Sequence, residues 1–145
     1  MNIISEQELK KYGKTFSLSA QAIALVNQQK ATWKPASSNY RSLKEVQIRS
    51  FDFGHFRIDC QYNPGRIRSS AANTSEAAIL SRPCFLCAEN RPAEQTGIAY
   101  QGEFTILANP YPIFPYHLTI PSNLHSPQQI SGNVDSLLQL GYDLS

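Results

Sequence analysis

A rigid linker in the second half of the chain constrains the fold most. Residues 104–108 and 117–120 are rich in β-branched and aromatic residues, which favours strands. The segment between them, NPYPIFPY, contains three prolines. Each proline fixes its own φ and lacks a backbone N–H donor, so the linker cannot continue either strand. We therefore expect two strands joined by a loop of fixed shape.

The start of the chain has a helical periodicity instead. Between residues 5 and 30, apolar residues recur at near-helical spacing, which predicts one or two helices. Pro35 and the serines and asparagine after it predict that the helix ends there. Around residues 33–40 we expect the chain to change from helix to sheet.

Alternating apolar and polar residues follow at 46–51 and 53–62, as in strands with one buried face. They predict a hairpin that turns near residues 52–54. Next, Asn63-Pro64-Gly65 signals a turn, and a connecting loop with a short helix near residues 75–80 is expected. Ser126 and Pro127 suggest a helix start, and residues 134–144 have helical apolar spacing.

These segments predict an α+β fold in a single domain, residues 1–145, with a helical lead-in at 1–32 and a sheet-forming part at 40–145. A domain of this length buries about 70% of its unfolded surface. Hydrophobic residues make up 41% and charged residues 17%, which indicates a folded globular protein.

The net charge and the N-terminal sequence limit the classes of binding partner and the cellular location that we expect. A net charge of +2 without a run of Lys or Arg argues against nucleic acid, so any bound anion is expected to be small. The N-terminus lacks the pattern of a signal peptide, and no stretch approaches the ~18 apolar residues of a membrane span. We expect a cytoplasmic protein that does not bind membranes.

Cys84 and Cys87 are separated by two residues, a spacing at which two thiolates on one turn can reach a zinc ion. A structural zinc usually has four protein ligands, and Cys60 and the three histidines are not arranged as a second close pair. Two other interpretations remain open. The cysteines can be buried small hydrophobes, or a redox pair, although Pro83 and the segment 90–92 break the regular structure that a thioredoxin-like motif requires.

Among the histidines, His125 is the better ligand candidate, because it has polar neighbours and lies beside a predicted helix start. His117 lies on a predicted strand and is equally well explained as structural. Arg66 and Arg68 can bind phosphate through the guanidinium fork, or remain solvated at the surface. Asn109 can present its amide to a sugar or base, or serve its own turn.

Several segments together resemble a known family: CFLC at 84–87, NRP at 90–92 and FTILANPYPIFPYHLTIPSNLH at 104–125. They are similar to the galactose-1-phosphate uridylyltransferase and ATP adenylyltransferase branch of the histidine-triad (HIT-like) superfamily. Asn-Pro-x-Arg at 63–66 is also similar to GDP-L-galactose phosphorylases. The resemblance, strongest over residues 63–129, implies part of a HIT-like antiparallel sheet with flanking helices. It also implies a nucleotidyltransferase or nucleotide-sugar phosphorylase.

The resemblance implies a structural zinc held by Cys84, Cys87 and His125, with a fourth ligand from a histidine near the nucleophile. It implies nucleotide-binding roles for Arg66 and Arg68 at the phosphates and for Asn109 at the nucleoside. The expected ligands are a nucleotide sugar or nucleoside polyphosphate, with phosphate or a sugar phosphate as acceptor.

The family's nucleophile lies in a His-x-His-x-Gln or similar motif, which this chain lacks. That imidazole attacks the α-phosphorus, and arginines cannot replace the attacking nitrogen. We therefore assign no catalytic residue and expect the chain to be an N-terminal, truncated part, inactive alone. Missing strands would leave apolar surface exposed, which predicts a homo-oligomer or a missing C-terminal part. The rival interpretation is a non-catalytic zinc- or nucleotide-binding module.

Overall fold

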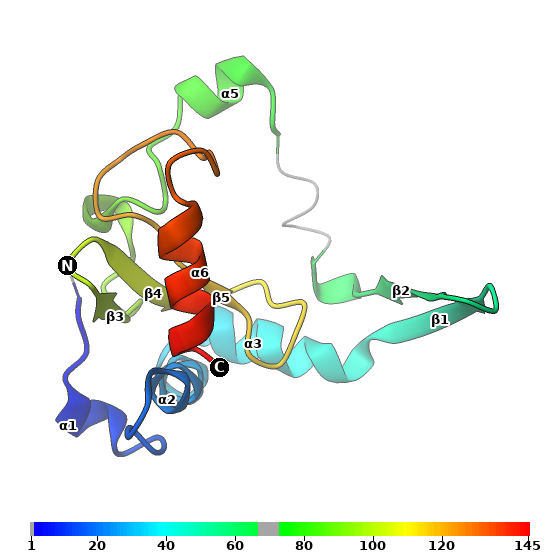
Figure 1. The fold of residues 1–145 in the computed structure, drawn as a ribbon, viewed down its shortest axis with the longest axis horizontal. Helices are drawn as coiled ribbons and strands as arrows, with labels where there is room; N and C mark the ends of the chain where they lie inside the picture. The colour runs from blue at the N-terminus through cyan, green and yellow to red at the C-terminus, as the bar shows by residue number, and fades with distance from the viewer. Residues whose placement is uncertain (1, 67–72) are drawn as a thin grey trace.

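The computed structural model describes residues 2–66 and 73–145, and within them the fold is α+β, as the sequence predicts (Figure 1). Two small antiparallel sheets are accompanied by helices. The elements in chain order are α1 (Glu6–Leu9), α2 (Leu18–Thr32), α3 (Lys34–Ser42), η1 (Leu43–Glu45), β1 (Gln47–Asp52), β2 (Arg57–Tyr62), η2 (Pro64–Arg66), α5 (Glu76–Leu80), η3 (Ala88–Asn90), β3 (Gly97–Tyr100), β4 (Phe104–Ala108), β5 (Leu118–Thr119) and α6 (Val134–Asp143).

The larger sheet has the strand order β3-β4-β5, with each pair antiparallel. The predicted strands at 104–108 and 117–120 are confirmed as β4 and the short β5. Strand β3 was not predicted. Its Gly97 is required by close packing, because a Cβ there would lie 2.5 Å from Thr105 Cγ2 and 3.0 Å from the Ile106 carbonyl oxygen.

The core forms where α2 packs against β3 and β4. The helices predicted between residues 5 and 30 are confirmed as α1 and α2, and Ala24 and Leu25 of α2 are fully buried. Leu140 of α6 packs against the same cluster, so α6 covers part of this core. A second cluster lies between α2, α3 and β4 and contains Val26, Trp33, Ala36, Tyr40 and Ala108. We call α1–α3, β3–β5 and α6 the body.

Two boundary predictions are wrong. Residues 33–40 do not lead into sheet, because Trp33 alone is extended and α3 begins at Lys34, with Pro35 in its first turn. A proline there loses no helical hydrogen bond, so it begins a helix as readily as it ends one. No helix begins at Ser126 and Pro127 either. The predicted C-terminal helix is confirmed as α6, but its N-cap is Asn133, after a turn at Gly132 with φ of 81°.

The predicted hairpin is confirmed as β1 and β2, paired from Gln47 opposite Tyr62 to Asp52 opposite Arg57. We call residues 47–62 the arm, since they project away from the body (Figure 1). The tip turns at Gly54, whose φ is 82° and whose N–H donates to Asp52 Oδ1. The predicted buried face is wrong for this single chain, because every residue of both strands is exposed. The short helix predicted near 75–80 is confirmed as α5, capped by Ser75.

Candidate functional site

The cysteine pair lies on a tight turn that neighbouring residues hold in shape. The Cys87 N–H donates to the Cys84 carbonyl at 3.2 Å, which closes the turn. The Asn90 side-chain amide donates to the same carbonyl at 2.9 Å, and Arg91 Nε donates to the Leu86 carbonyl at 2.8 Å. Both thiols are half-buried, which contradicts the interpretation that they are buried small hydrophobes.

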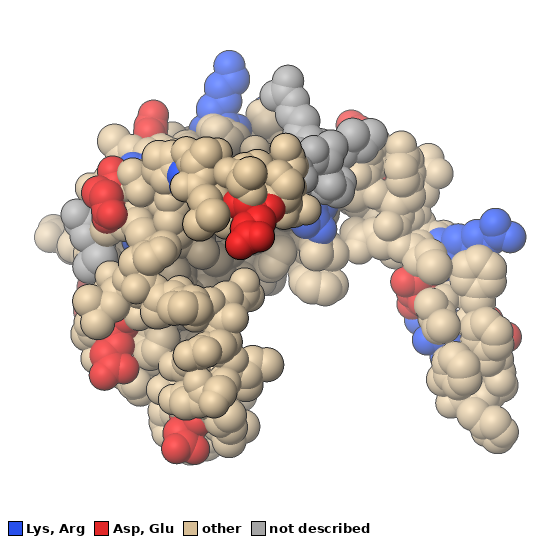
Figure 2. Space-filling view, turned by 90° about the horizontal axis from the view of Figure 1, so that it is seen from above, with Lys and Arg blue, Asp and Glu red and all other residues tan. Residues whose placement is uncertain are grey.

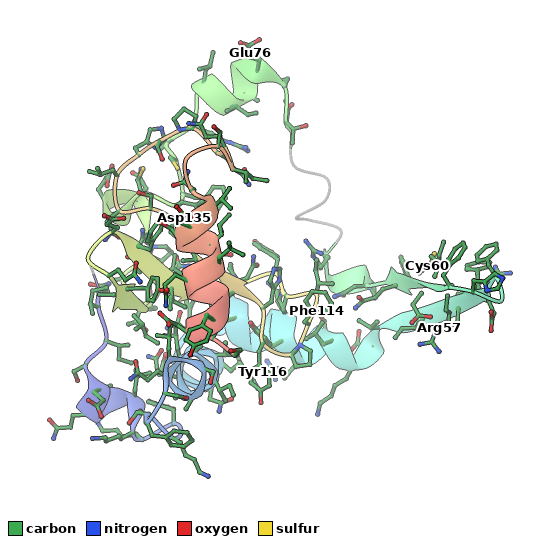
Figure 3. The ribbon with its side chains drawn as sticks, viewed as in Figure 1. Arg57, Cys60, Glu76, Phe114, Tyr116 and Asp135 are labelled. Carbon is green, nitrogen blue, oxygen red and sulfur yellow. The ribbon has the colours of Figure 1, made fainter. Side chains whose placement is uncertain are left out.

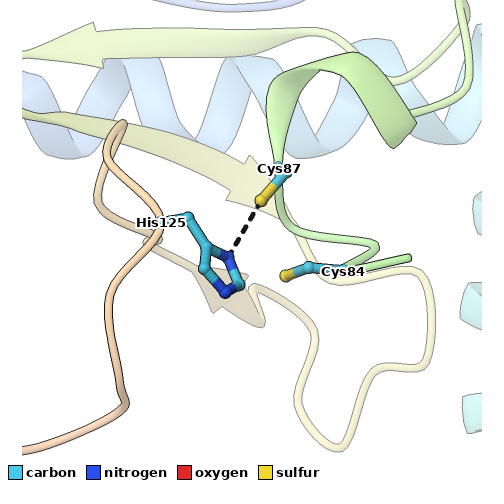
Figure 4. A group of neighbouring side chains, drawn as sticks. All are labelled: Cys84, Cys87 and His125. Atoms are coloured by element: carbon cyan, nitrogen blue, oxygen red, sulfur yellow. Dashed lines mark hydrogen bonds between the residues drawn. The ribbon is translucent and has the colours of Figure 1, made fainter. Parts of the chain in front are cut away.

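His125 approaches this turn from the loop after β5. The start of that loop is tied to β4, because the Thr105 N–H donates to the Pro121 carbonyl and the Asn123 N–H donates to the Glu103 carbonyl. These bonds bring His125 over the cysteine turn, with its Nδ1 3.1 Å from Cys87 Sγ (Figure 4).

The three predicted ligands therefore come together from two separate segments. One ligand atom from each of Cys84, Cys87 and His125 lies within 4.8 Å of the other two. Around a tetrahedral zinc, bonds of ~2.3 Å to sulfur and ~2.1 Å to nitrogen place a thiolate and an imidazole nitrogen about 3.6 Å apart. The arrangement fits zinc after a separation of Cys87 and His125 by about half an ångström.

The two thiols differ in acidity. Hydrogen bonding from the Leu86 backbone lowers the pKa of Cys84, against a smaller opposing effect of its partial removal from water. Partial removal from water raises the pKa of Cys87, and the interaction with Cys84 adds to this. Cys84 is therefore the thiol that is ready to ionise first, and a metal has to displace the proton of Cys87.

A cavity of about 870 Å³ opens beside the three ligand residues. Its lining also includes Thr119 of β5, Ile120 and residues of the loop at 121–130. The metal ligands thus line this cavity, and a metal there would fix the cysteine turn and the His125 loop on its two sides.

Two of the predicted nucleotide-binding residues, Arg66 and Asn109, act on His117, which immediately precedes β5. The Asn109 N–H donates to the His117 carbonyl at 2.8 Å, and the positive charge of Arg66 contributes to the lowered pKa of the His117 ring. Asn109 is already engaged, since its Nδ2 donates to Thr119 Oγ1 and its Oδ1 accepts from the Tyr111 N–H. Its amide holds the proline-rich loop in place. Arg68 lies outside the described residues.

His117 is built into the same loop. Its Nδ1 accepts from the Ile113 N–H at 3.2 Å, which is compatible with the neutral ring carrying its proton on Nε2. Burial is the main cause that lowers the pKa of His117, and the positive charge of Arg66 adds to it. The Tyr40 hydroxyl donates to the His117 carbonyl, so α3 also supports this position.

Sequence reasoning missed Asn90, Arg91 and Tyr40. The NRP segment was part of the resemblance, but no role was assigned to it, because bonds from side chains to backbone carbonyls leave no characteristic residue pattern. Tyr40 was missed because its helix was not predicted.

Within residues 2–66 and 73–145, no helix has both the length and the apolar character needed to cross a membrane. Comparisons with curated proteins and with solved structures give no match. One family model matches residues 25–145, which include the arm, the cysteine turn and the larger sheet. Because the match covers most of the chain, this protein belongs to the family described as domain of unknown function DUF4922.

Proposed function

We propose that this chain binds one zinc ion through Cys84, Cys87 and His125 and is the zinc-stabilised, nucleotide-binding part of a HIT-like nucleotidyltransferase or nucleotide-sugar phosphorylase. The proposal of a metal site rests on one observation: ligand atoms of Cys84, Cys87 and His125 lie within 4.8 Å of one another, although Cys87 and His125 are 38 residues apart in the sequence. Two thiolates and an imidazole form a donor set that suits zinc better than the hard cations.

The metal's role would be structural. Bound zinc would join the cysteine turn to the loop that carries His125, and so hold the two walls of the adjacent cavity together. Asn90 and Arg91 keep the turn in the shape that presents both thiols. Three protein ligands leave a fourth tetrahedral position for water or another donor.

The nucleotide part of the proposal rests on the resemblance and on the position of Arg66. Its positive charge acts on His117, which follows the proline-rich loop, and a guanidinium can meet a phosphate by charge and by paired hydrogen bonds. Asn109 would act mainly by fixing this loop. No histidine of the chain is proposed as nucleophile, because the chain lacks the His-x-His-x-Gln motif, His117 Nδ1 is engaged and His125 is a proposed metal ligand. We therefore expect binding without turnover.

Metal content and cobalt spectra of the purified chain test the zinc site. We expect one metal per chain, and its loss in Cys84→Ser and His125→Asn. Matched controls are Cys60→Ser and His55→Asn, which change the same residue types on the arm. Equal metal content in all four variants, or none in the wild type, would refute the site.

Calorimetric titration with a nucleoside diphosphate sugar tests the second part. We expect Arg66→Ala to weaken binding by at least about tenfold, the loss of one good charge-assisted contact. Arg57→Ala on the arm is the matched control and should leave affinity unchanged. Turnover by the isolated chain would contradict the absence of a nucleophile, and an absence of nucleotide binding would favour a module that binds only zinc.

A further inference from the structure

The cysteine turn has a geometry that suits a disulfide as well as a metal. The Cys87 N–H donates to the Cys84 carbonyl at 3.2 Å, which is the bond from residue i+3 to residue i that closes a β-turn. The Cα atoms of these two residues in a β-turn lie less than about 7 Å apart, and a disulfide needs about 4.4–6.8 Å. The two Sγ atoms already lie within 4.8 Å of each other. A bond between them therefore needs side-chain rotation and at most a small shift of the turn.

The third cysteine is out of reach of this pair within one chain. In the space-filling view the arm stands clear of the rest of the molecule (Figure 2), and Figure 3 places Cys60 on that arm. Cys84 and Cys87 instead line the same cavity as Thr119 of β5. A disulfide within the chain is thus restricted to the close pair, and the exposed Cys60 thiol is an internal control for reactivity.

Both thiols of the pair are accessible to a small molecule, but His125 covers them unequally. Cys84 and Cys87 are half-buried, and both line the cavity. The His125 ring lies against Cys87, with Nδ1 3.1 Å from its Sγ, and the hydrogen bond drawn in Figure 4 joins these two residues and not Cys84. Cys84 is therefore the sulfur that an incoming molecule meets first.

His125 also links the cysteine turn to the loop at 124–130. Every residue of this loop is exposed. Among the described residues, the contact between Cys87 and His125 is the one hydrogen bond that joins residues 124–130 to a segment outside 121–133. Without that link the loop is held at its two ends alone. The chemical state of the cysteines therefore decides whether this wall of the cavity is fixed.

We propose that Cys84 and Cys87 form a redox switch that controls the metal site. The reduced pair holds zinc together with His125, whereas the oxidised pair is a disulfide, which lacks the thiolates that zinc requires. This proposal rests on the zinc site of the proposed function and assigns its regulation. Oxidation releases His125 and the loop at 124–130, and so opens one wall of the cavity. The pair thus switches the metal site and is not the catalytic redox pair that the sequence left open.

The oxidant that suits this pair is a small-molecule disulfide. The Cys84 thiolate attacks one of its sulfur atoms, which forms a mixed disulfide and releases one small thiolate. The Cys87 thiolate then attacks the Cys84 sulfur, which closes the protein disulfide and releases the second small thiolate. The cysteine pair loses two electrons and the small disulfide gains them. The two released thiolates take up two protons from the solvent, and a dithiol reverses the reaction by the same exchange.

Zinc release and disulfide mapping test the switch on the full chain loaded with zinc. We expect hydroxyethyl disulfide to release the one bound zinc ion, measured with a chromogenic chelator, and to form a disulfide between Cys84 and Cys87, measured by mass spectrometry. Dithiothreitol should restore zinc binding. Cys60→Ser is the matched control and should respond as the wild type does. In Cys87→Ser a mixed disulfide should accumulate at Cys84, because no second thiolate completes the exchange.

The zinc content before oxidation separates failure of the switch from failure of the zinc site. A chain that keeps its zinc, with Cys84 and Cys87 still reduced after Cys60 has reacted, overturns the switch and leaves the zinc site standing. Zinc release with mixed disulfides on both cysteines, and no bond between them, also overturns the switch. A chain that binds no zinc before oxidation refutes the proposed metal site, and the switch with it.

Discussion

The body and the arm both contain antiparallel strands with apolar side chains, yet their exposure is opposite. In the body, Ile106 of β4 is fully buried beneath α2, whereas Ile58 of β2 on the arm is 46% exposed. The difference lies in what is packed against the strand. The alternation of apolar and polar residues therefore predicts that a strand has one apolar face. Whether that face is buried depends on a second element, from elsewhere in the fold or from another molecule.

The largest expected effect comes from comparing these two isoleucines. Ile106→Ala leaves a cavity in the core and should lower the free energy of unfolding by about 2–5 kcal/mol. Ile58→Ala removes a side chain that the single chain leaves exposed, so in dilute protein the change should stay within about 0.5 kcal/mol. Urea unfolding of both variants measures the difference. Equal losses would mean that the arm folds against the body in solution.

Zinc binding should stabilise the segments around the proposed metal site and leave the arm unchanged, because the proposed ligands all lie outside the arm. At a zinc concentration 100 times the dissociation constant, binding stabilises the folded state by about 2.7 kcal/mol. Hydrogen exchange should slow at residues 84–91 and 121–125 and stay unchanged at residues 47–62. Lowering the pH should weaken zinc binding, since both thiols and His125 have to lose their protons. Protection that appears on the arm instead would contradict this placement.

Substitution of one glycine in the body and one in the arm should give a smaller difference in stability between these two regions. Gly97→Ala places a Cβ against Thr105 and the Ile106 backbone, so it should cost about 1–3 kcal/mol of global stability. Gly54 has open space around it, and Gly54→Ala is strained only by the φ of 82° at the tip of the arm. That variant should speed exchange on the arm and leave the unfolding of the body unchanged. A loss of global stability in Gly54→Ala would show that the two regions unfold together.

Much of the secondary structure was predictable, for identifiable reasons. Strand β4 is rich in β-branched and aromatic residues, helix α6 has helical apolar spacing, and Ser75 caps α5. Strand β3 was missed because four residues are too few for a periodic signal. The boundary at Pro35 was wrong because a proline suits both the end of one helix and the first turn of the next.

The site was predictable in part. Residue type and order suggested Cys84, Cys87 and His125, and the structure brings them together, although metal binding itself stays a prediction. The roles of Asn109 and Arg91 depend on which carbonyls and hydroxyls lie near them after folding, which no spacing in the sequence reveals. Exposed apolar surface was expected, but which strands lack a cover was beyond the sequence, because alternation is the same whether the cover is present or not.

The smallest effect concerns the two histidines outside the proposed metal site. Burial and the Arg66 charge hold the pKa of His117 below its ordinary value of 6.5, so the unfolded chain takes up a proton at a higher pH than the folded one. The stability from this neutral ring is therefore complete above pH 6.5 and is lost as the pH falls from there through the lowered pKa. Because the ring keeps some contact with water, we expect a loss below about 1 kcal/mol. His117→Gln should flatten the stability profile of the wild type between pH 7 and 5, relative to the profile of His55→Gln at the tip of the arm. If His55→Gln flattens the profile equally, the pH dependence does not arise from the packing of His117 in the body.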